Sequence, residues 1–369
     1  MKFVEVTFMS GFLVNEQDLQ NYADLLGGTR GKPGNQQEAV DAASRYLAQY
    51  AKLPDGTTDS LFARLGVHHA KIYSAVRQGL ENADHAINGS AVALLTVKQR
   101  YQAADAAAEQ QIDAILPHAD RPPQPFGGKA DFTGLPDAAT LLKTPNVPPD
   151  YPDPTAPARD LLNWISGSAI VESVVTQALG WNPYERYAEA FAGDWHAFAS
   201  SGMAFGAVGN CLAQVGYNIG SGNQALGQTW QGNAADEAYR YFDELANDVR
   251  FFGDAVSRLE QPYLEVADSA FAASQGMADL LHSFTDDVVL IITGVAAGGT
   301  LEVASRLVHL LPEFAKAFLD KLGSAISIAE LLAGMARELQ VAGDIKDAAG
   351  YLYGSPVAGG PYQPPAQLG

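Results

Sequence analysis

The sequence predicts an all-α protein, an elongated bundle of long antiparallel helical hairpins. Two long stretches, residues 59–115 and 233–284, place apolar residues in alternating steps of three and four, which is the spacing of one helix face. The turn that precedes the second stretch, Trp230-Gln-Gly232, suits the tip of such a hairpin. Additional helices are expected after residue 285.

Composition limits the classes of function. Hydrophobic residues make up 47% and charged residues 18% of the 369 residues, so a sizeable core is available. The formal net charge of −19 argues against nucleic acid or an anionic membrane surface as an electrostatically bound partner. The N-terminus lacks the pattern of a signal peptide, and no run approaches the roughly 20 apolar residues of a membrane-spanning helix. We therefore expect any export to use another route.

The N-terminal region predicts helices that fold back along a longer one. Residues 1–13 alternate weakly, as in a short strand or an irregular lead-in. Asn15 is a good N-cap for a helix through about Leu26, and a second helix is expected over 36–52. A helix over 59–115 would be about 80 Å long at about 1.5 Å per residue. It cannot bury its apolar stripe alone, so the earlier helices should pack along it.

The proline-dense segment 117–157 predicts an extended linker rather than a packed domain. Its few apolar residues, Phe126, Phe132 and Leu141-Leu142, are expected to hold it against a neighbouring surface.

A helix is predicted over 183–228, with Asn182 as N-cap and Pro183 in the first helical position. Apolar residues repeat along it every seven positions: Phe191, Phe198, Phe205, Leu212 and Ile219. Glycines repeat beside them, at Gly202, Gly209 and Gly216. Since each mid-helix glycine costs about 0.5–1 kcal/mol relative to alanine, a second helix should approach closely there and offset the cost. The alternative is that the glycines fray the helix into two pieces.

The turn at Trp230–Gly232 is expected to reverse the chain, because glycine readily adopts positive φ. The indole of Trp230 would pack across the open end of the hairpin and stay partly exposed. Pro262 lies within the following stretch, 233–284, whose apolar phase continues past it, so we expect a kink rather than a helix end.

The C-terminal part begins with an uncharged run, 288–301, that is too short to span a bilayer. Further helices are expected over 302–320 and 324–349, before a disordered-looking tail. The apolar run either folds back as a small helical core or inserts into a membrane and oligomerises.

No catalytic, cofactor-binding or metal-binding constellation is recognisable. The seven histidines lack metal-ligand spacing, and His68-His69 are expected in a solvated or seam-edge position. Cys211, the single cysteine, has no basic neighbour on its apolar helix and predicts a buried, inert thiol.

The tryptophan-x-glycine turn between two long helices resembles the WxG superfamily of actinobacterial type VII (ESX) secretion substrates. The surrounding residues add to the resemblance: Pro183-Tyr-Glu-Arg-Tyr187, Ala192-Gly-Asp-Trp195 and Trp230-Gln-Gly-Asn-Ala-Ala-Asp236. The family implies an all-α, non-enzymatic protein without a cofactor or a bound metal, exported without a classical signal peptide.

A second export feature of the family, tyrosine-x-x-x-acidic, matches Tyr101-Gln-Ala-Ala-Asp105. The same spacing occurs at Tyr239–Asp243, but the family places this motif at a hairpin end away from the WxG turn of the same hairpin. In PE–PPE pairs and EspB-like proteins the two features lie side by side. The resemblance therefore implies a composite, partner-binding export signal of Trp230, Gly232, Tyr101 and Asp105.

The expected organisation is an N-terminal helical module over 1–116, a linker over 117–160, the WxG hairpin over 161–285, apolar helices over 286–350 and a tail over 351–369. The implied partners are the type VII secretion machinery and a dedicated chaperone or WxG-type protein, with self-association left open. Two alternatives remain: a membrane- or lipid-active oligomerising protein that acts through 286–350, and the trafficking portion of a toxin.

Overall fold

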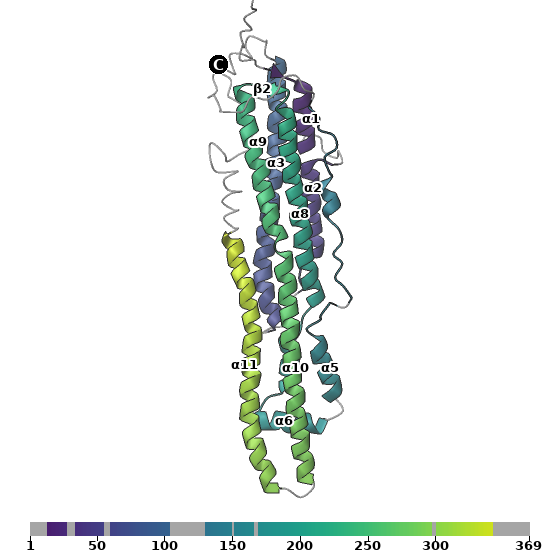
Figure 1. Ribbon diagram of the computed structural model, residues 1–369, viewed down its shortest axis with the longest axis vertical. Helices are drawn as coiled ribbons and strands as arrows, with labels where there is room; N and C mark the ends of the chain where they lie inside the picture. Colours follow the sequence, from purple (N-terminus) through teal and green to yellow (C-terminus); the bar gives the residue numbers. More distant parts are fainter. Residues whose placement is uncertain are drawn as a thin grey trace, which may run out of the picture.

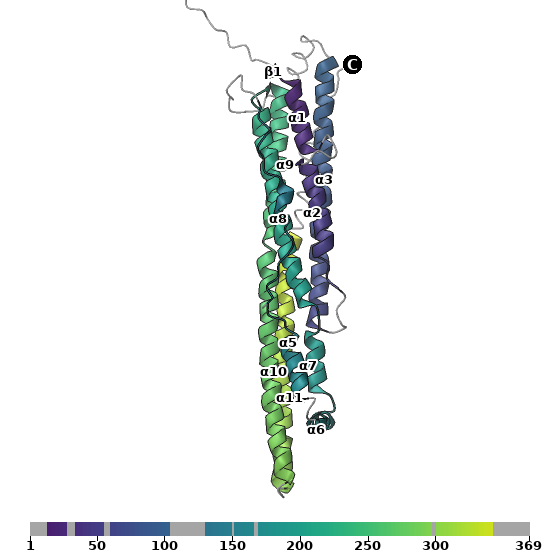
Figure 2. The ribbon, with the colours of Figure 1, turned by 90° about the vertical axis from the view of Figure 1, so that its right-hand side faces the viewer.

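The computed structural model shows an all-α protein whose helices form one elongated bundle (Figure 1; Figure 2). The residues that it describes are 13–27, 34–54, 60–103, 130–149, 151–165, 169–296 and 300–341. Two short strands, β1 (Leu13–Val14) and β2 (Trp230–Gln231), pair antiparallel at one end of the bundle. The predicted fold class is confirmed.

The N-terminal helices pack as the sequence predicts. Helices α1 (Glu16–Leu26) and α2 (Gln36–Tyr50) follow one another and run antiparallel to α3 (Leu61–Ala103). The side chain of Asn15 caps α1 by accepting hydrogen bonds from the next turn. The last part of the predicted long helix, 104–115, lies outside the described residues.

The central hairpin consists of α8 (Trp195–Leu226) and α9 (Asn233–Ser257). A Cβ atom added at Gly209 would lie 2.2 Å from the backbone nitrogen of Ser257, so only glycine permits this approach of the two helices. At Gly216 the same atom would lie 2.6 Å from a carbonyl oxygen of α9. Helix α8 is continuous, so the expected close packing is confirmed and fraying does not occur.

The predicted helix over 183–228 is wrong at its N-terminal end, because it divides into α7 (Pro183–Phe191) and α8. Asp194 caps α8 by accepting a hydrogen bond from the Ala197 backbone N–H at 2.8 Å. Between the helices, Gly193 packs so closely on the Phe62 ring that a Cβ atom would lie 2.2 Å from it. The chain bends there to admit Phe62 of α3.

The kink expected at Pro262 is also wrong, because one helix ends and another begins just before it. Helix α9 ends at Ser257, and α10 (Glu260–Ala296) continues in nearly the same direction. Proline has no N–H to offer the carbonyl four residues earlier, and its ring clashes with that carbonyl. The apolar phase continues because the two helix axes stay nearly aligned.

Helix α10 and helix α11 (Thr300–Val341) form a second hairpin that extends the bundle (Figure 1). The rings of Phe284 and Phe314 stack with centroids 3.7 Å apart, and Phe318 is fully buried. The described part of this region therefore folds back as a helical core. Helix α11 is one helix where two were expected, because its apolar face continues through Gly323.

The linker lies along the bundle, and its described part holds a single short 3₁₀ helix, η1 (Ala138–Leu141). Phe132 stacks on Tyr22 with ring centroids 6.0 Å apart, which confirms its expected contact. Leu142 also packs on the core, Leu141 is exposed, and Phe126 lies outside the described residues.

Two short helices, α5 (Ala156–Ile165) and α6 (Ala169–Leu179), flank α10 (Figure 1). Helix α5 begins before residue 160, where the linker was expected to end. No helix among the described residues is long and apolar enough to cross a membrane.

Candidate partner-binding site at the Trp230 turn

The turn that joins α8 to α9 is built from local hydrogen bonds and one glycine conformation. The Thr229 N–H donates to the Leu226 carbonyl at 3.0 Å, which tightens the end of α8. Gly232 has a φ of 118° and is the N-cap residue of α9. The Asp236 N–H then donates to its carbonyl at 3.0 Å. The positive φ predicted for this glycine is confirmed, and side chains rarely tolerate that conformation.

The indole of Trp230 is only 2% exposed, so the expectation that it is partly exposed is wrong. At this turn β1 pairs with β2, and Val14 lies directly opposite Trp230. The Asn15 N–H extends this pairing by donating to the Thr229 carbonyl at 2.9 Å. Strand β1 therefore runs along the hairpin tip.

Tyr101 lies near the C-terminal end of α3, at the same end of the bundle as β2 (Figure 1; Figure 2). Its side chain is 7% exposed and belongs to the hydrophobic core. One turn earlier, the Lys98 ammonium donates to the Gln20 side chain at 2.9 Å, which joins α3 to α1 near this end. Asp105 lies outside the described residues.

Tyr22 of α1 connects the N-terminal helices to the hairpin below its tip. Its hydroxyl donates to the Ile219 carbonyl of α8 at 3.0 Å, and its ring meets Phe242 of α9 edge-on at 5.0 Å. Complete burial raises the pKa of this hydroxyl well above its usual range, so Tyr22 stays protonated as a donor. On α9, the Tyr241 hydroxyl lies 2.8 Å from the Ser90 hydroxyl of α3. These contacts fix four helices around the tip.

Sequence reasoning missed the role of Val14 at this site. The available signal was the weak alternation over 1–13, which left a short strand or an irregular lead-in open and indicated no partner for it. A two-residue strand gains its stability from the strand that it pairs with, so its own sequence carries little of the pattern.

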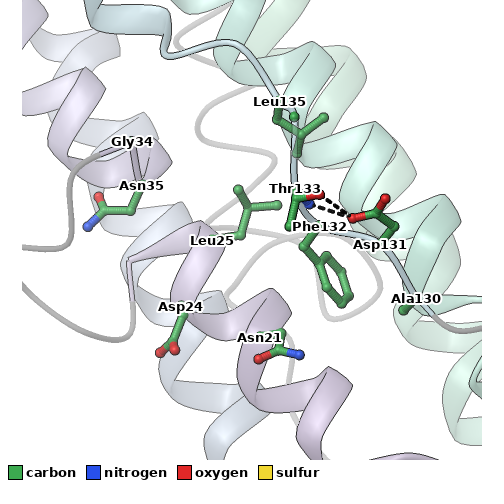
Figure 3. A pocket seen from close by; sticks show the side chains of 11 residues that line it. Asn21, Asp24, Leu25, Gly34, Asn35, Ala130, Asp131, Phe132, Thr133 and Leu135 are labelled. Atoms are coloured by element: carbon green, nitrogen blue, oxygen red, sulfur yellow. Dashed lines mark hydrogen bonds between the residues drawn. The ribbon is translucent and has the colours of Figure 1, made fainter.

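A cavity of about 800 Å³ with a mixed polar and apolar lining opens beside α1 (Figure 3). Asn21, Asp24 and Leu25 of α1 form one wall, and the linker around Phe132 forms another. In that linker the Asp131 carboxylate accepts hydrogen bonds from the backbone N–H and hydroxyl of Thr133.

The expectation that His69 is solvated or lies at the edge of the seam is wrong, because its side chain is 4% exposed. Its Nε2 lies 2.8 Å from the Ala51 carbonyl, which can only accept, so Nε2 carries the proton. Nδ1 then accepts from the Tyr263 hydroxyl at 2.8 Å. Burial lowers the pKa of His69 to about 4, while the bond to Ala51 opposes this shift. The group is neutral and joins α2, α3 and α10.

The thiol of Cys211 is buried, as predicted, and burial raises its pKa to about 12. A thiol that keeps its proton at neutral pH is a poor nucleophile. Among the described residues, no three histidine, cysteine or acidic side chains gather in a way that could hold a metal ion.

No protein-family model matches the chain, and no curated protein matches it. The residues of the tip therefore carry the functional proposal.

Proposed function

We propose that this protein is a non-enzymatic substrate of a type VII (ESX) secretion system, and that its hairpin tip carries the export signal. The observation that supports the proposal is a Trp-x-Gly turn, with Gly232 at positive φ, between helices of 32 and 25 residues. Tyr101, the first residue of the tyrosine-x-x-x-acidic motif, belongs to the same end of the bundle.

In this proposal the four signal residues divide into two roles. Trp230 and Gly232 shape the tip, since the indole is buried and the glycine sets the direction of α9. Tyr101 and Asp105 are one helical turn apart in sequence. Because the Tyr101 side chain is buried in the core, its role is to hold this end of α3 in place, and Asp105 is the group that a recognition protein would contact. The secretion machinery, or a chaperone of the WxG type, is the proposed partner.

The test is export from an actinobacterial host with a working type VII system, measured as protein in the medium relative to protein in the cells. Because Trp230 is buried, alanine there would leave a cavity costing about 3–5 kcal/mol, and failed folding would resemble failed export. Trp230→Phe and Asp105→Asn are the sharper changes. We expect each to reduce export about tenfold or more at unchanged cellular level.

The matched control is Trp195→Phe, because Trp195 belongs to the same hairpin and is 1% exposed. It should be exported like the wild type, provided that both phenylalanine variants melt at similar temperatures. Wild-type export of both Trp230→Phe and Asp105→Asn would refute the composite signal. Equal export from a host without the secretion system would refute the proposed route.

A further inference from the structure

At the proposed recognition turn, β1 pairs with the edge of β2 in the way that a strand from a partner protein could. The register pairs Leu13 with Gln231 and Val14 with Trp230, and the backbone bond from Asn15 to Thr229 extends it. Directly opposed residues of an antiparallel pair project from the same face. Val14, which is partly buried and packs on the core, therefore lies beside the Trp230 indole.

The attachment of β1 is short, whereas the helix that follows is held firmly. Among the residues that the structure describes, strand β1 has two residues and pairs with β2 alone. Helix α1, in contrast, has Leu19 and Tyr22 fully buried and the Tyr22 hydroxyl bonded to α8. Asn15 lies at the boundary and caps α1 with its own side chain. Strand β1 can therefore leave the tip while α1 stays in place.

We propose that β1 is a displaceable strap over Trp230, and that an extended segment of a partner protein takes its place during recognition. The uncovered edge of β2 offers main-chain hydrogen bonds, and the indole offers an apolar face for a branched side chain at the position of Val14. The inference rests on the proposed function, since it makes the tip the recognition surface and names an extended strand as the recognised form.

The first test uses the purified full-length protein labelled with fluorotryptophan, whose four tryptophans give four ¹⁹F resonances. A Trp230→Phe sample assigns the Trp230 signal, and a soluble paramagnetic agent reports exposure. Val14→Asp places a charge beside the indole and should raise the relaxation of Trp230 severalfold, toward that of Trp164, which is 45% exposed. The nearly isosteric Val14→Thr should change it little. Unchanged protection in Val14→Asp, with Trp195 still protected, would overturn the strap.

If Val14→Asp fails to fold, a disulfide between β1 and β2 tests whether the strap can open. Opposed residues of antiparallel strands have Cα atoms about 4.5–5.5 Å apart, within the range of a disulfide. Leu13→Cys with Gln231→Cys, in a Cys211→Ala background, can therefore be oxidised or reduced at will. Oxidation should slow hydrogen exchange of the Asn15 amide about tenfold, because the strap can no longer open. Equal exchange rates in the two forms would overturn the proposal.

The nature of the partner is tested with a synthetic peptide of residues 10–16, added to the Val14→Asp protein. The peptide should restore the protection of Trp230, and the same peptide with proline in place of Leu13 should not, since proline removes a main-chain donor. Failure of the first peptide at millimolar concentration would overturn the extended-strand partner. These measurements need no secretion system, so they stand apart from the export test: normal export of both Trp230→Phe and Asp105→Asn would refute the composite signal and leave the strap.

Discussion

At the scale of single residues, His69 joins three helices through a group that must remain uncharged. Its two ring nitrogens bond to the Ala51 carbonyl and the Tyr263 hydroxyl, and its ring lies 5.8 Å from that of Phe205. A proton on Nδ1 would face the hydroxyl that now donates to it. The surrounding phenyl and phenol rings offer a positive charge little compensation, which is why burial lowers the pKa.

This arrangement predicts that the protein loses stability in mild acid. The pKa of His69 is about 4 in the folded protein and about 6.5 when unfolded, so below pH 6.5 the unfolded chain binds the additional proton. The free energy of unfolding should therefore fall from pH 6.5 to about pH 4, by about 3 kcal/mol at most. Urea unfolding at pH 7.0 and 4.5 measures the change.

The comparison that isolates His69 uses two variants of α3. His69→Gln should show a smaller loss between the two pH values than the wild type, because glutamine does not titrate. His85→Gln, at an exposed position on the same helix, should keep the wild-type loss. Equal pH dependence in all three proteins would show that His69 does not contribute.

At the scale of elements, the contact of α8 with α9 depends on the absence of side chains. A Cβ atom at Gly209 would lie 2.2 Å from the Ser257 nitrogen and 2.5 Å from the Gly253 carbonyl oxygen. Both are backbone atoms, so the helices must separate to admit a methyl group. In the same way, a Cβ atom added at Gly253 of α9 would lie 2.5 Å from the Ala213 nitrogen of α8. Gly209 and Gly253 therefore each leave the space into which the backbone of the other helix packs.

Gly209→Ala should therefore destabilise the protein by about 1–3 kcal/mol, although alanine is the better helix former. Gly66→Ala is the matched control, because Gly66 lies within α3 and an added Cβ would meet nothing within 4 Å apart from its chain neighbours and the backbone of its own helix. That change should stabilise the protein by about 0.5–1 kcal/mol. Thermal unfolding of the two variants gives the comparison. Shifts of the melting temperature in the same direction would show that the close contact at Gly209 does not require glycine.

The spacing of apolar residues predicts these elements well, because a helix face is recorded in its own sequence. The heptad spacing of Phe198, Phe205 and Leu212 predicted the helix α8, and the glycines beside it predicted its close packing on a second helix. Features that depend on a distant partner were not predictable. The bend at Gly193 exists to admit Phe62, which is remote in sequence. At the candidate site the same limit applies: the positive φ of Gly232 followed from residue type, whereas the pairing of Trp230 with Val14 joins residues far apart in sequence.

At the scale of the whole molecule, the two hairpins lie end to end along the bundle (Figure 1). Helices α8 and α9 pack with α1, α2 and α3, whereas α10 packs with α11, with α8 and with the short helices around it, and α11 also packs on α3. The contacts of α10 with α8 and of α11 with α3 join the two hairpins where they overlap. A molecule of this shape is expected to open locally, one segment at a time, rather than as a single unit.

Phe314→Ala tests this expectation, because it removes the ring that stacks on Phe284 and lies far from the Trp230 tip. Amide exchange over α11 should become faster, while exchange over α8 and α9 should remain unchanged. Leu319→Ala, at a position 51% exposed on the same helix, should leave both regions as in the wild type. Faster exchange throughout α8 in the Phe314 variant would show instead that the two hairpins unfold together, and a partner at either end would then stabilise the whole length.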